Sequence, residues 1–129
     1  MLRVSTIIVI ITLMLINSLS GGEGMNVKST TKATFEQDVI KSTKIVLLDV
    51  WAPWCAPCRS MEPVLELVEN ETKDWAEIIK LDASVEMDLV QELGVSSLPT
   101  FLIYKNGQIV GSSSATSKAN LIELMSQAK

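Results

Sequence analysis

The chain contains no histidine and only two cysteines among its 129 residues. Without histidine there can be no histidine-based catalytic triad, no imidazole proton shuttle and none of the usual zinc ligand sets. Two cysteines are too few for the disulfide-rich class of secreted proteins. They stand close together, at positions 55 and 58, so any chemistry that they perform is joint chemistry.

Positive charge is scarce as well, and no basic run occurs. Lys and Arg together number 11 against 15 acidic residues, and the formal net charge is -4. The first twenty residues contain one charge, Arg3, so the rest of the chain has ten basic and fifteen acidic residues and a net charge of -5. Because phosphate binding depends mainly on Lys and Arg, we expect no nucleic-acid partner. The 47% hydrophobic and 20% charged composition is typical of a globular domain.

The N-terminal segment has the pattern of a targeting signal. Residues 1–20 combine one basic residue, an apolar run over residues 7–16 and small residues that predict cleavage after Ser20. The run is short for a membrane span, which needs ~20 apolar residues. An uncleaved membrane anchor through residues 4–19 is the alternative. With either a signal peptide or an anchor, we expect the domain to work outside the cytoplasm, where disulfides persist.

A third interpretation is a later start of translation. Met25 follows the glycine-rich stretch Gly21–Gly24, and a start there would give a cytoplasmic protein. We interpret residues 21–33 as a linker and the start of the domain, and residues 34–129 as the domain itself.

Helix and strand patterns alternate along this domain. A capping box at Thr34–Gln37 predicts a short helix that ends near Ser42. A continuous apolar run at residues 45–51 predicts a strand covered on both faces, as in a parallel sheet under helices. Residues 76–82, with Ile78, Ile79 and Leu81, predict a second strand.

Three further helices follow from apolar residues at helical spacing and from end signals. The first covers residues 56–70, and Pro63 should kink it because proline has no amide hydrogen. The second covers residues 85–93 and stops at Gly94, a residue suited to the left-handed cap. Ser117 caps the last helix, whose apolar residues are Leu121, Ile122, Leu124 and Met125.

The dipeptide Asn106-Gly107 separates two apolar runs, residues 100–104 and 108–111, and is a strong signal for a β-hairpin. Strands that alternate with helices predict a parallel layer, to which the hairpin adds an antiparallel edge. We therefore predict an α/β fold: a mixed central sheet with a C-terminal antiparallel hairpin and helices on both faces.

The segment Trp51–Cys58 carries the chemistry, at the junction of a predicted strand and helix. Cys55 would lie at the helix N-terminus, where unpaired amides and the helix dipole stabilise a thiolate. A thiolate is the attacking species in disulfide exchange. Cys58, one turn further, can then attack Cys55 and release a bound client. Pro57 fits a first-turn position and restricts the loop.

Two other interpretations of the cysteine pair stay open from the residues alone. Half of a zinc site would need more ligands, and the chain offers no histidine and no other cysteine. A purely structural disulfide that closes so short a loop would constrain the unfolded chain little. The strand–helix junction favours a redox role. We expect no metal and no organic cofactor, because the cysteine pair itself stores the two electrons.

At these residues the sequence resembles the thioredoxin family. The similarity extends from about Thr34 to the C-terminus and rests on separate motifs in the right order, namely Asp49–Cys58 with the following Pro63, then Gly94–Thr100, then Lys105–Gly107. The resemblance implies the thioredoxin fold and a protein-disulfide oxidoreductase that reduces its clients. It also implies protein disulfides as substrates and an electron donor, either a thioredoxin reductase or, for an exported protein, a membrane thiol relay.

The resemblance assigns roles to residues around the pair. Cys55 is then the nucleophile, Cys58 the resolving thiol, and Pro99 a proline with a cis peptide bond beside them. An ordinary trans turn at Pro99 is the alternative. Trp54, Ala56, Pro57, Leu98 and Pro99 would form an apolar collar, and the backbone of Leu98 would pair with an extended client chain.

Asp49 is the acidic member of an apolar strand. Burial should raise its pKa until it holds a proton part of the time, and the resemblance implies that it lies behind Cys58 and helps to deprotonate it. Lys80 matches the family's lysine near that aspartate. The alternative for Asp49 is an aspartate that lies at a sheet edge or is hydrogen-bonded, and the alternative for Lys80 is a solvated lysine on its strand.

Two departures leave the direction of electron flow open. The inter-cysteine pair is Ala56-Pro57 where thioredoxins usually have Gly-Pro, and a signal segment is common only in exported relatives. An exported thiol oxidase or isomerase of the same fold is therefore one alternative to a reductase. A non-catalytic peptide-binding module is another. We expect a monomer.

Overall fold

The computed structural model describes residues 27–114 and 117–129. The predicted signal peptide or anchor in residues 1–20 lies outside this part. None of the helices in the described ranges is long and apolar enough to cross a membrane.

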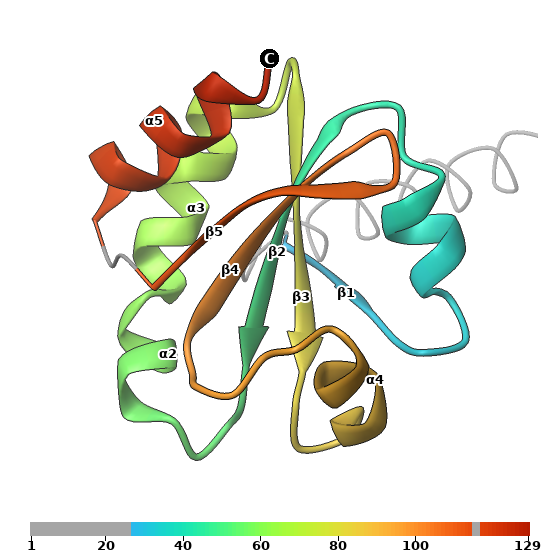
Figure 1. The fold of residues 1–129 in the computed structure, drawn as a ribbon. Helices are drawn as coiled ribbons and strands as arrows, with labels where there is room; N and C mark the ends of the chain where they lie inside the picture. The colour runs from blue at the N-terminus through green and yellow to red at the C-terminus, as the bar shows by residue number, and fades with distance from the viewer. Residues whose placement is uncertain (1–26, 115–116) are drawn as a thin grey trace, which may run out of the picture.

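Five strands form one mixed sheet in the order β1-β3-β2-β4-β5 (Figure 1). Their bounds are β1 Lys28–Thr30, β2 Ile45–Trp51, β3 Ala76–Asp82, β4 Thr100–Lys105 and β5 Gln108–Ser113. The first three strands run parallel, whereas β4 is antiparallel to β2 and to β5. The predicted mixed sheet with a C-terminal antiparallel hairpin is confirmed.

Helices cover both faces of the sheet, as predicted (Figure 1). Their bounds are η1 Glu36–Ile40, a π-helical turn, then α2 Ala56–Ser60, α3 Glu62–Thr72, α4 Met87–Glu92 and α5 Lys118–Gln127. The two helices α3 and α5 pack on one face, and η1 and α4 lie on the other.

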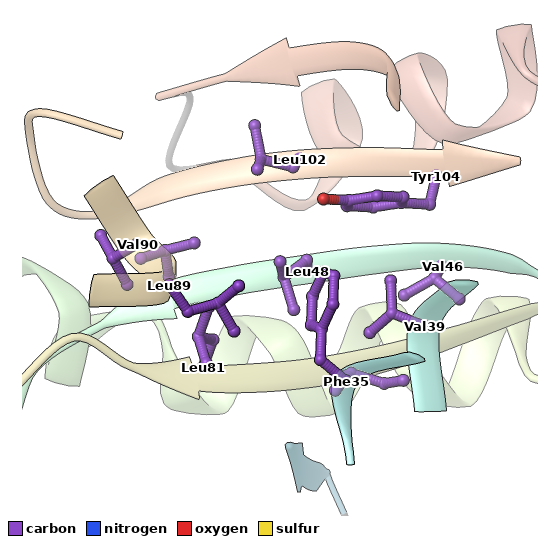
Figure 2. Packing of buried hydrophobic residues seen from close by; sticks show 11 residues of the cluster. Phe35, Val39, Val46, Leu48, Leu81, Leu89, Val90, Leu102 and Tyr104 are labelled. Atoms are coloured by element: carbon purple, nitrogen blue, oxygen red, sulfur yellow. The ribbon is translucent and has the colours of Figure 1, made fainter. Parts of the chain in front are cut away.

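The alternation of side chains along β2 divides the core between these two faces. Val46, Leu48 and Val50 belong to the cluster on the side of η1 and α4, whereas Ile45 and Leu47 belong to the cluster under α3 and α5. Figure 2 shows the first cluster. By the same alternation, Asp49 and Trp51 point to the side of α3.

Predicted end signals and turns are confirmed in three places. Asn106 and Gly107 both have positive φ, 52° and 78°, as the tight hairpin requires. Gly94 follows α4 with a φ of 76°. The hydroxyl of Ser117 accepts a hydrogen bond from the amide of Asn120 at 3.2 Å and so caps α5.

The predicted kinked helix over residues 56–70 is wrong in its continuity, because the chain forms two helices, α2 and α3, with Met61 between them. Pro63 has no amide hydrogen to donate to the carbonyl of Arg59, so the helical ladder breaks there. The amide of Met61 instead bonds the carbonyl of Cys58 at 3.1 Å, a tighter turn. Pro63 becomes a first-turn residue of α3.

The capping box predicted at Thr34 is also wrong. Its hydroxyl accepts a hydrogen bond from the amide of Thr31 at 3.1 Å, so it serves the turn before η1 and not the helix. The sequence also missed β1, which falls in the segment interpreted as linker and domain start. Three residues are too few to show a strand period, and only pairing with β3 reveals this strand.

Candidate active site

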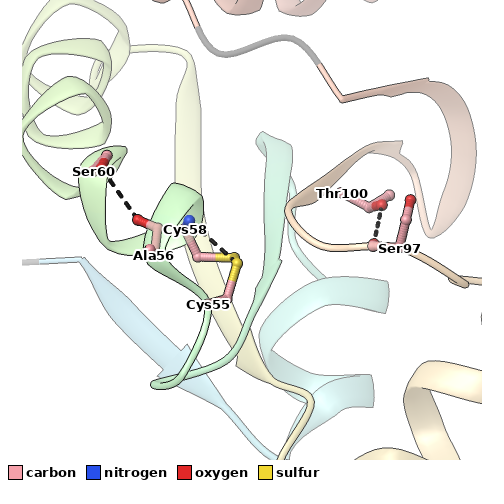
Figure 3. Close-up of a disulfide and its surroundings, with 6 residues drawn as sticks. All are labelled: Cys55, Ala56, Cys58, Ser60, Ser97 and Thr100. Carbon is pink, nitrogen blue, oxygen red and sulfur yellow. Dashed lines mark hydrogen bonds between the residues drawn. A yellow bond between two sulfur atoms is a disulfide. The ribbon is translucent and has the colours of Figure 1, made fainter.

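The two cysteines are joined in a disulfide at the end of β2 and the start of α2, with their Cα atoms 5.3 Å apart (Figure 3). Cys55 caps α2, and its Sγ accepts a hydrogen bond from the amide of Cys58 at 3.3 Å. Once the disulfide is reduced, this amide and the others at the helix start favour negative charge on Cys55. The geometry therefore suits Cys55 to act as a thiolate.

The loop before the disulfide follows from the local sequence. Trp51 ends β2, and the amide of Cys55 donates to the carbonyl of Ala52 at 3.1 Å, which turns the chain towards the helix. Pro57 occupies the first turn of α2, where a missing amide hydrogen costs nothing. Cys58 lies inward on α2 and is almost fully buried.

An open groove with a volume of about 720 Å³ lies beside the disulfide. Four residues of the predicted collar, Trp54, Ala56, Pro57 and Leu98, line it together with Cys55. The Trp54 side chain is 73% exposed. An exposed aromatic ring beside a redox disulfide provides contact area for an extended client chain.

The opposite wall of the groove is one that the sequence did not predict. It consists of Met87, Val90 and Gln91 of α4, together with Val95, Ser96 and Ser97 of the following loop. Met87 is exposed despite its apolar side chain, but an exposed residue cannot be told from a core residue by helical spacing alone. Only the packing of α4 beside the disulfide identifies this wall.

Pro99, which the sequence placed in the collar, is not among the residues that line the groove. The Leu98–Pro99 peptide bond is cis, as the resemblance implied, and Pro99 itself is buried. The carbonyl of Ser97 accepts a hydrogen bond from the hydroxyl of Thr100 at 2.6 Å, which braces this turn (Figure 3). Leu98 packs against the small buried cluster of Ala52, Cys55 and Cys58. Leu98 is thus the member of this turn that lines the groove with Cys55.

Asp49 is buried in the central strand β2, with 1% of its surface exposed. Because β2 is an inner strand, Asp49 does not lie at a sheet edge, and its Oδ1 atom has no hydrogen-bond partner, so the alternative to a buried, unpaired carboxyl is wrong. Burial raises the pKa of Asp49 from 3.8 to about 7; the charge of Lys80 opposes this rise and the charge of Glu62 adds to it. A carboxyl with this pKa can exchange a proton near neutral pH.

Lys80 faces Asp49 in register from the adjacent strand β3. Its side chain is only 8% exposed, so the alternative of a solvated lysine is wrong. The Nζ atom lies 3.2 Å from Oε1 of Glu62 and 3.9 Å from the centre of the Trp51 ring. Burial, an ion pair and a cation–π contact together hold this ammonium group in place.

The sequence interpretation missed Glu62. A signal was available, because Glu62 follows Cys58 by four residues, which is one helical turn. Its ion pair with Lys80 joins α3 to the sheet next to the cysteines. Among the residues that the structure describes, no group of three metal-ligating side chains occurs.

The fold and the disulfide define a dithiol–disulfide oxidoreductase. The thioredoxin family model matches residues 26–127. The chain is 35% identical over 99 residues to thioredoxin 1 of Synechococcus elongatus, covering 74% of this chain and 92% of that protein. It is 44% identical over 84 residues to thioredoxin of Listeria monocytogenes, covering 65% and 80%.

A third relative combines two activities in its name. The chain is 40% identical over 80 residues to the bifunctional thioredoxin reductase/thioredoxin of Mycobacterium leprae, which is 62% of this chain and 18% of that longer protein. The present chain belongs to the thioredoxin family. It is a protein-disulfide reductase with a redox-active cysteine pair, as the sequence predicted.

Proposed function

We propose that this protein reduces disulfides of client proteins outside the cytoplasm, with Cys55 as the nucleophile and Cys58 as the resolving thiol. The observation that carries these two roles is the asymmetry of the pair. Cys55 lines the open groove and caps α2, whereas Cys58 lies inward on the helix and does not line the groove. A client sulfur can therefore approach Cys55 first.

In the first step, the reduced Cys55 thiolate attacks one sulfur of the client disulfide. A bond forms between Cys55 Sγ and that sulfur, the client disulfide breaks, and the other client sulfur leaves as a thiolate that takes a proton from water. The amide of Cys58 supports the Cys55 thiolate before attack. Trp54 and Leu98 hold the client chain in the groove.

In the second step, Cys58 attacks Cys55 Sγ. The Cys55–Cys58 disulfide forms, the mixed disulfide breaks, and the second client sulfur leaves as a thiolate that takes a proton from water. Cys58 must lose its proton for this attack, and Asp49 accepts it as the general base, a role supported by its burial and its pKa of about 7. The client gains two electrons and two protons, and the enzyme becomes oxidised.

A reduction assay on a model protein disulfide, with dithiothreitol regenerating the enzyme, tests the exchange function. We expect catalysis by the wild type and none by a variant with serine at both cysteine positions. If that variant still binds unfolded clients and the wild type shows no exchange activity, the protein is a peptide-binding module.

The location outside the cytoplasm rests on the signal-like pattern of residues 1–20. The direction of β1 is compatible with it. Because β1 runs parallel to β3, the chain enters the sheet from the end opposite to the disulfide. The N-terminal residue of the mature protein from its native cell decides the matter. Gly21 indicates secretion, Met1 an anchor, and Met25 a cytoplasmic protein.

The family implies protein disulfides as substrates and a thioredoxin reductase as the electron donor. For an exported protein, we propose that a membrane thiol relay takes the place of this reductase. Reduction of the purified disulfide by NADPH and a thioredoxin reductase would favour the cytoplasmic alternative. We further propose that the protein acts as a monomer, which light scattering on the purified chain tests directly.

A further inference from the structure

Three charged side chains from three different elements interact with one another. Asp49 comes from β2, Lys80 from β3 and Glu62 from α3. In the described structure, Lys80 forms an ion pair with Glu62 at 3.2 Å and none with Asp49, although Asp49 is its register partner. Oδ1 of Asp49 is buried without a hydrogen-bond partner.

We propose that Glu62 is a positioning residue for the resolving step: it holds the ammonium group of Lys80 away from Asp49, so that the Asp49 carboxylate stays free to accept the proton of Cys58. The proposal deepens the proposed function, because it rests on the roles given there to Asp49 and Cys58. Glu62 itself need not contact the client or either sulfur.

The physical argument starts from the competition of two carboxylates for one cation. A buried aspartate beside a lysine normally pairs with it, and such a pair stabilises the ionised form. A paired carboxylate is a weaker proton acceptor, because protonation would break the pair. Glu62 removes this constraint by binding Lys80, and its own negative charge further favours the protonated form of Asp49.

Lys80 and Glu62 are the charged groups that act on Asp49. Its register partner on β4 is Phe101, which carries no charge. The cation–π contact with Trp51 keeps the Lys80 ammonium group on the side of Glu62. Arg59 of α2 is exposed, and Cys58 is the remaining titratable group on that helix when the disulfide is reduced.

Partial exposure distinguishes Glu62 from its two partners. Its side chain is 39% exposed, whereas Lys80 and Asp49 are buried. A charge-removing substitution at this partly open position should therefore leave the core packing intact. Such a substitution therefore separates an electrostatic role of Glu62 from a merely structural one.

The test is a titration of Asp49 by carboxyl-carbon NMR in the oxidised protein, in wild type and in Glu62→Gln. We expect the Asp49 pKa to fall by about one pH unit in the variant, as a change of one nearby charge typically produces. The acid limb of the pH–rate profile for client release should shift to lower pH by the same amount. Glu66→Gln removes one charge from the same helix one turn further on and serves as the matched control, with no shift expected.

A Lys80→Met background separates the direct effect of Glu62 from the effect through Lys80. If Glu62 acts by holding Lys80, Glu62→Gln should shift the Asp49 pKa less in that background than in wild type. An unchanged Asp49 pKa in Glu62→Gln, or equal shifts in both backgrounds, would overturn the proposal. The NMR titration needs no activity, so this failure is distinguishable from a failure of the proposed function, which would appear as an inactive wild type.

Discussion

Asp49 and Lys80 lie opposite each other in register on β2 and β3, yet within the described structure their side chains form no ion pair. Lys80 binds Glu62 on α3, and Oδ1 of Asp49 is buried without a partner. The centre of the sheet thus holds a carboxyl group with a pKa of about 7. This arrangement has consequences for stability as well as for catalysis.

Replacing Asp49 by Asn should reduce the dependence of stability on pH. Because burial raises the pKa from 3.8 to about 7, the folded protein holds a proton over a pH range in which the unfolded chain has lost it. This contribution to stability is fully present below pH 3.8 and is lost as the pH rises to about 7. Wild type should lose roughly 4–5 kcal/mol from this group, at about 1.4 kcal/mol per pH unit over the interval from 3.8 to about 7.

Urea unfolding of the oxidised protein at several pH values measures this effect. The Asp49→Asn variant should become more stable relative to wild type as the pH rises from about 3 to about 8, which is roughly one pH unit beyond each end of the range. Asp88→Asn, at an exposed position on α4, is the control and should show no such trend. If the free energies of unfolding of wild type and Asp49→Asn change in parallel with pH, the claim that Asp49 is a buried carboxyl with a raised pKa is contradicted.

Cys58→Ser should trap clients on the enzyme. The nucleophile Cys55 remains and forms the mixed disulfide, but no second thiol is present to release the client. Non-reducing electrophoresis and mass spectrometry should detect the adduct on Cys55. Cys55→Ser should form none, and adducts of equal yield in the two variants would refute the assignment of outer and inner sulfur.

Trp54→Ala should weaken client binding with little effect on folding. The side chain is 73% exposed and lines the groove, so its loss should change stability by no more than about 0.5 kcal/mol. We expect KM for a protein disulfide to rise several-fold while reduction of a small aromatic disulfide changes little. Leu67→Ala, which removes another exposed apolar side chain but from α3, should leave both reactions unchanged.

Gly107→Ala should destabilise the fold more than Gly94→Ala. Both glycines have positive φ, 78° and 76°, so each substitution carries the cost of a left-handed backbone, roughly 1–2 kcal/mol. A Cβ at Gly107 would also lie 2.9 Å from the carbonyl oxygen of Ile40, whereas a Cβ at Gly94 meets nothing within 4 Å. Urea unfolding of the two variants compares them, and equal losses would show that the hairpin moves away from η1 without cost.

The equilibrium with glutathione should place this disulfide among reducing couples. Thioredoxins have potentials of about −270 mV, whereas strongly oxidising couples lie near −120 mV. We expect a value close to the first, measured by alkylation of free thiols across a series of glutathione buffers. A potential close to about −120 mV would favour the exported oxidase. The variant Ala56→Gly would then test whether the Ala56-Pro57 pair raises the potential.

Much of the fold could be predicted because its signals are local. The strands at residues 45–51 and 76–82 have the predicted bounds, since the apolar run of the first and the clustered apolar residues Ile78, Ile79 and Leu81 of the second are visible in a short window. The hairpin at Asn106-Gly107 and the cap at Ser117 depend on the conformational preferences of single residues. Such signals do not require knowledge of any distant part of the chain.

The errors occurred where a distant partner or a competing bond decided the outcome. Thr34 had the right residue type for a cap, but its hydroxyl bonds Thr31 instead. The strand β1 exists because β3 offers a free edge to pair with. Pro63 was recognised as a disruption, but the competing hydrogen bond from the amide of Met61 to the carbonyl of Cys58 divides the helix into α2 and α3 where a kink was predicted.

The sequence by itself determined that two thiols stand one helical turn apart at the end of a buried strand, because their spacing and the change of hydrophobic period are properties of a dozen consecutive residues. Only the tertiary structure decided what surrounds them. In the folded protein, α4 lies beside Cys55 and completes a groove. Lys80 forms its ion pair with Glu62, and Oδ1 of Asp49 has no partner. Burial and ion pairing arise between residues that are far apart along the chain, so they become visible only when the helices pack on the sheet.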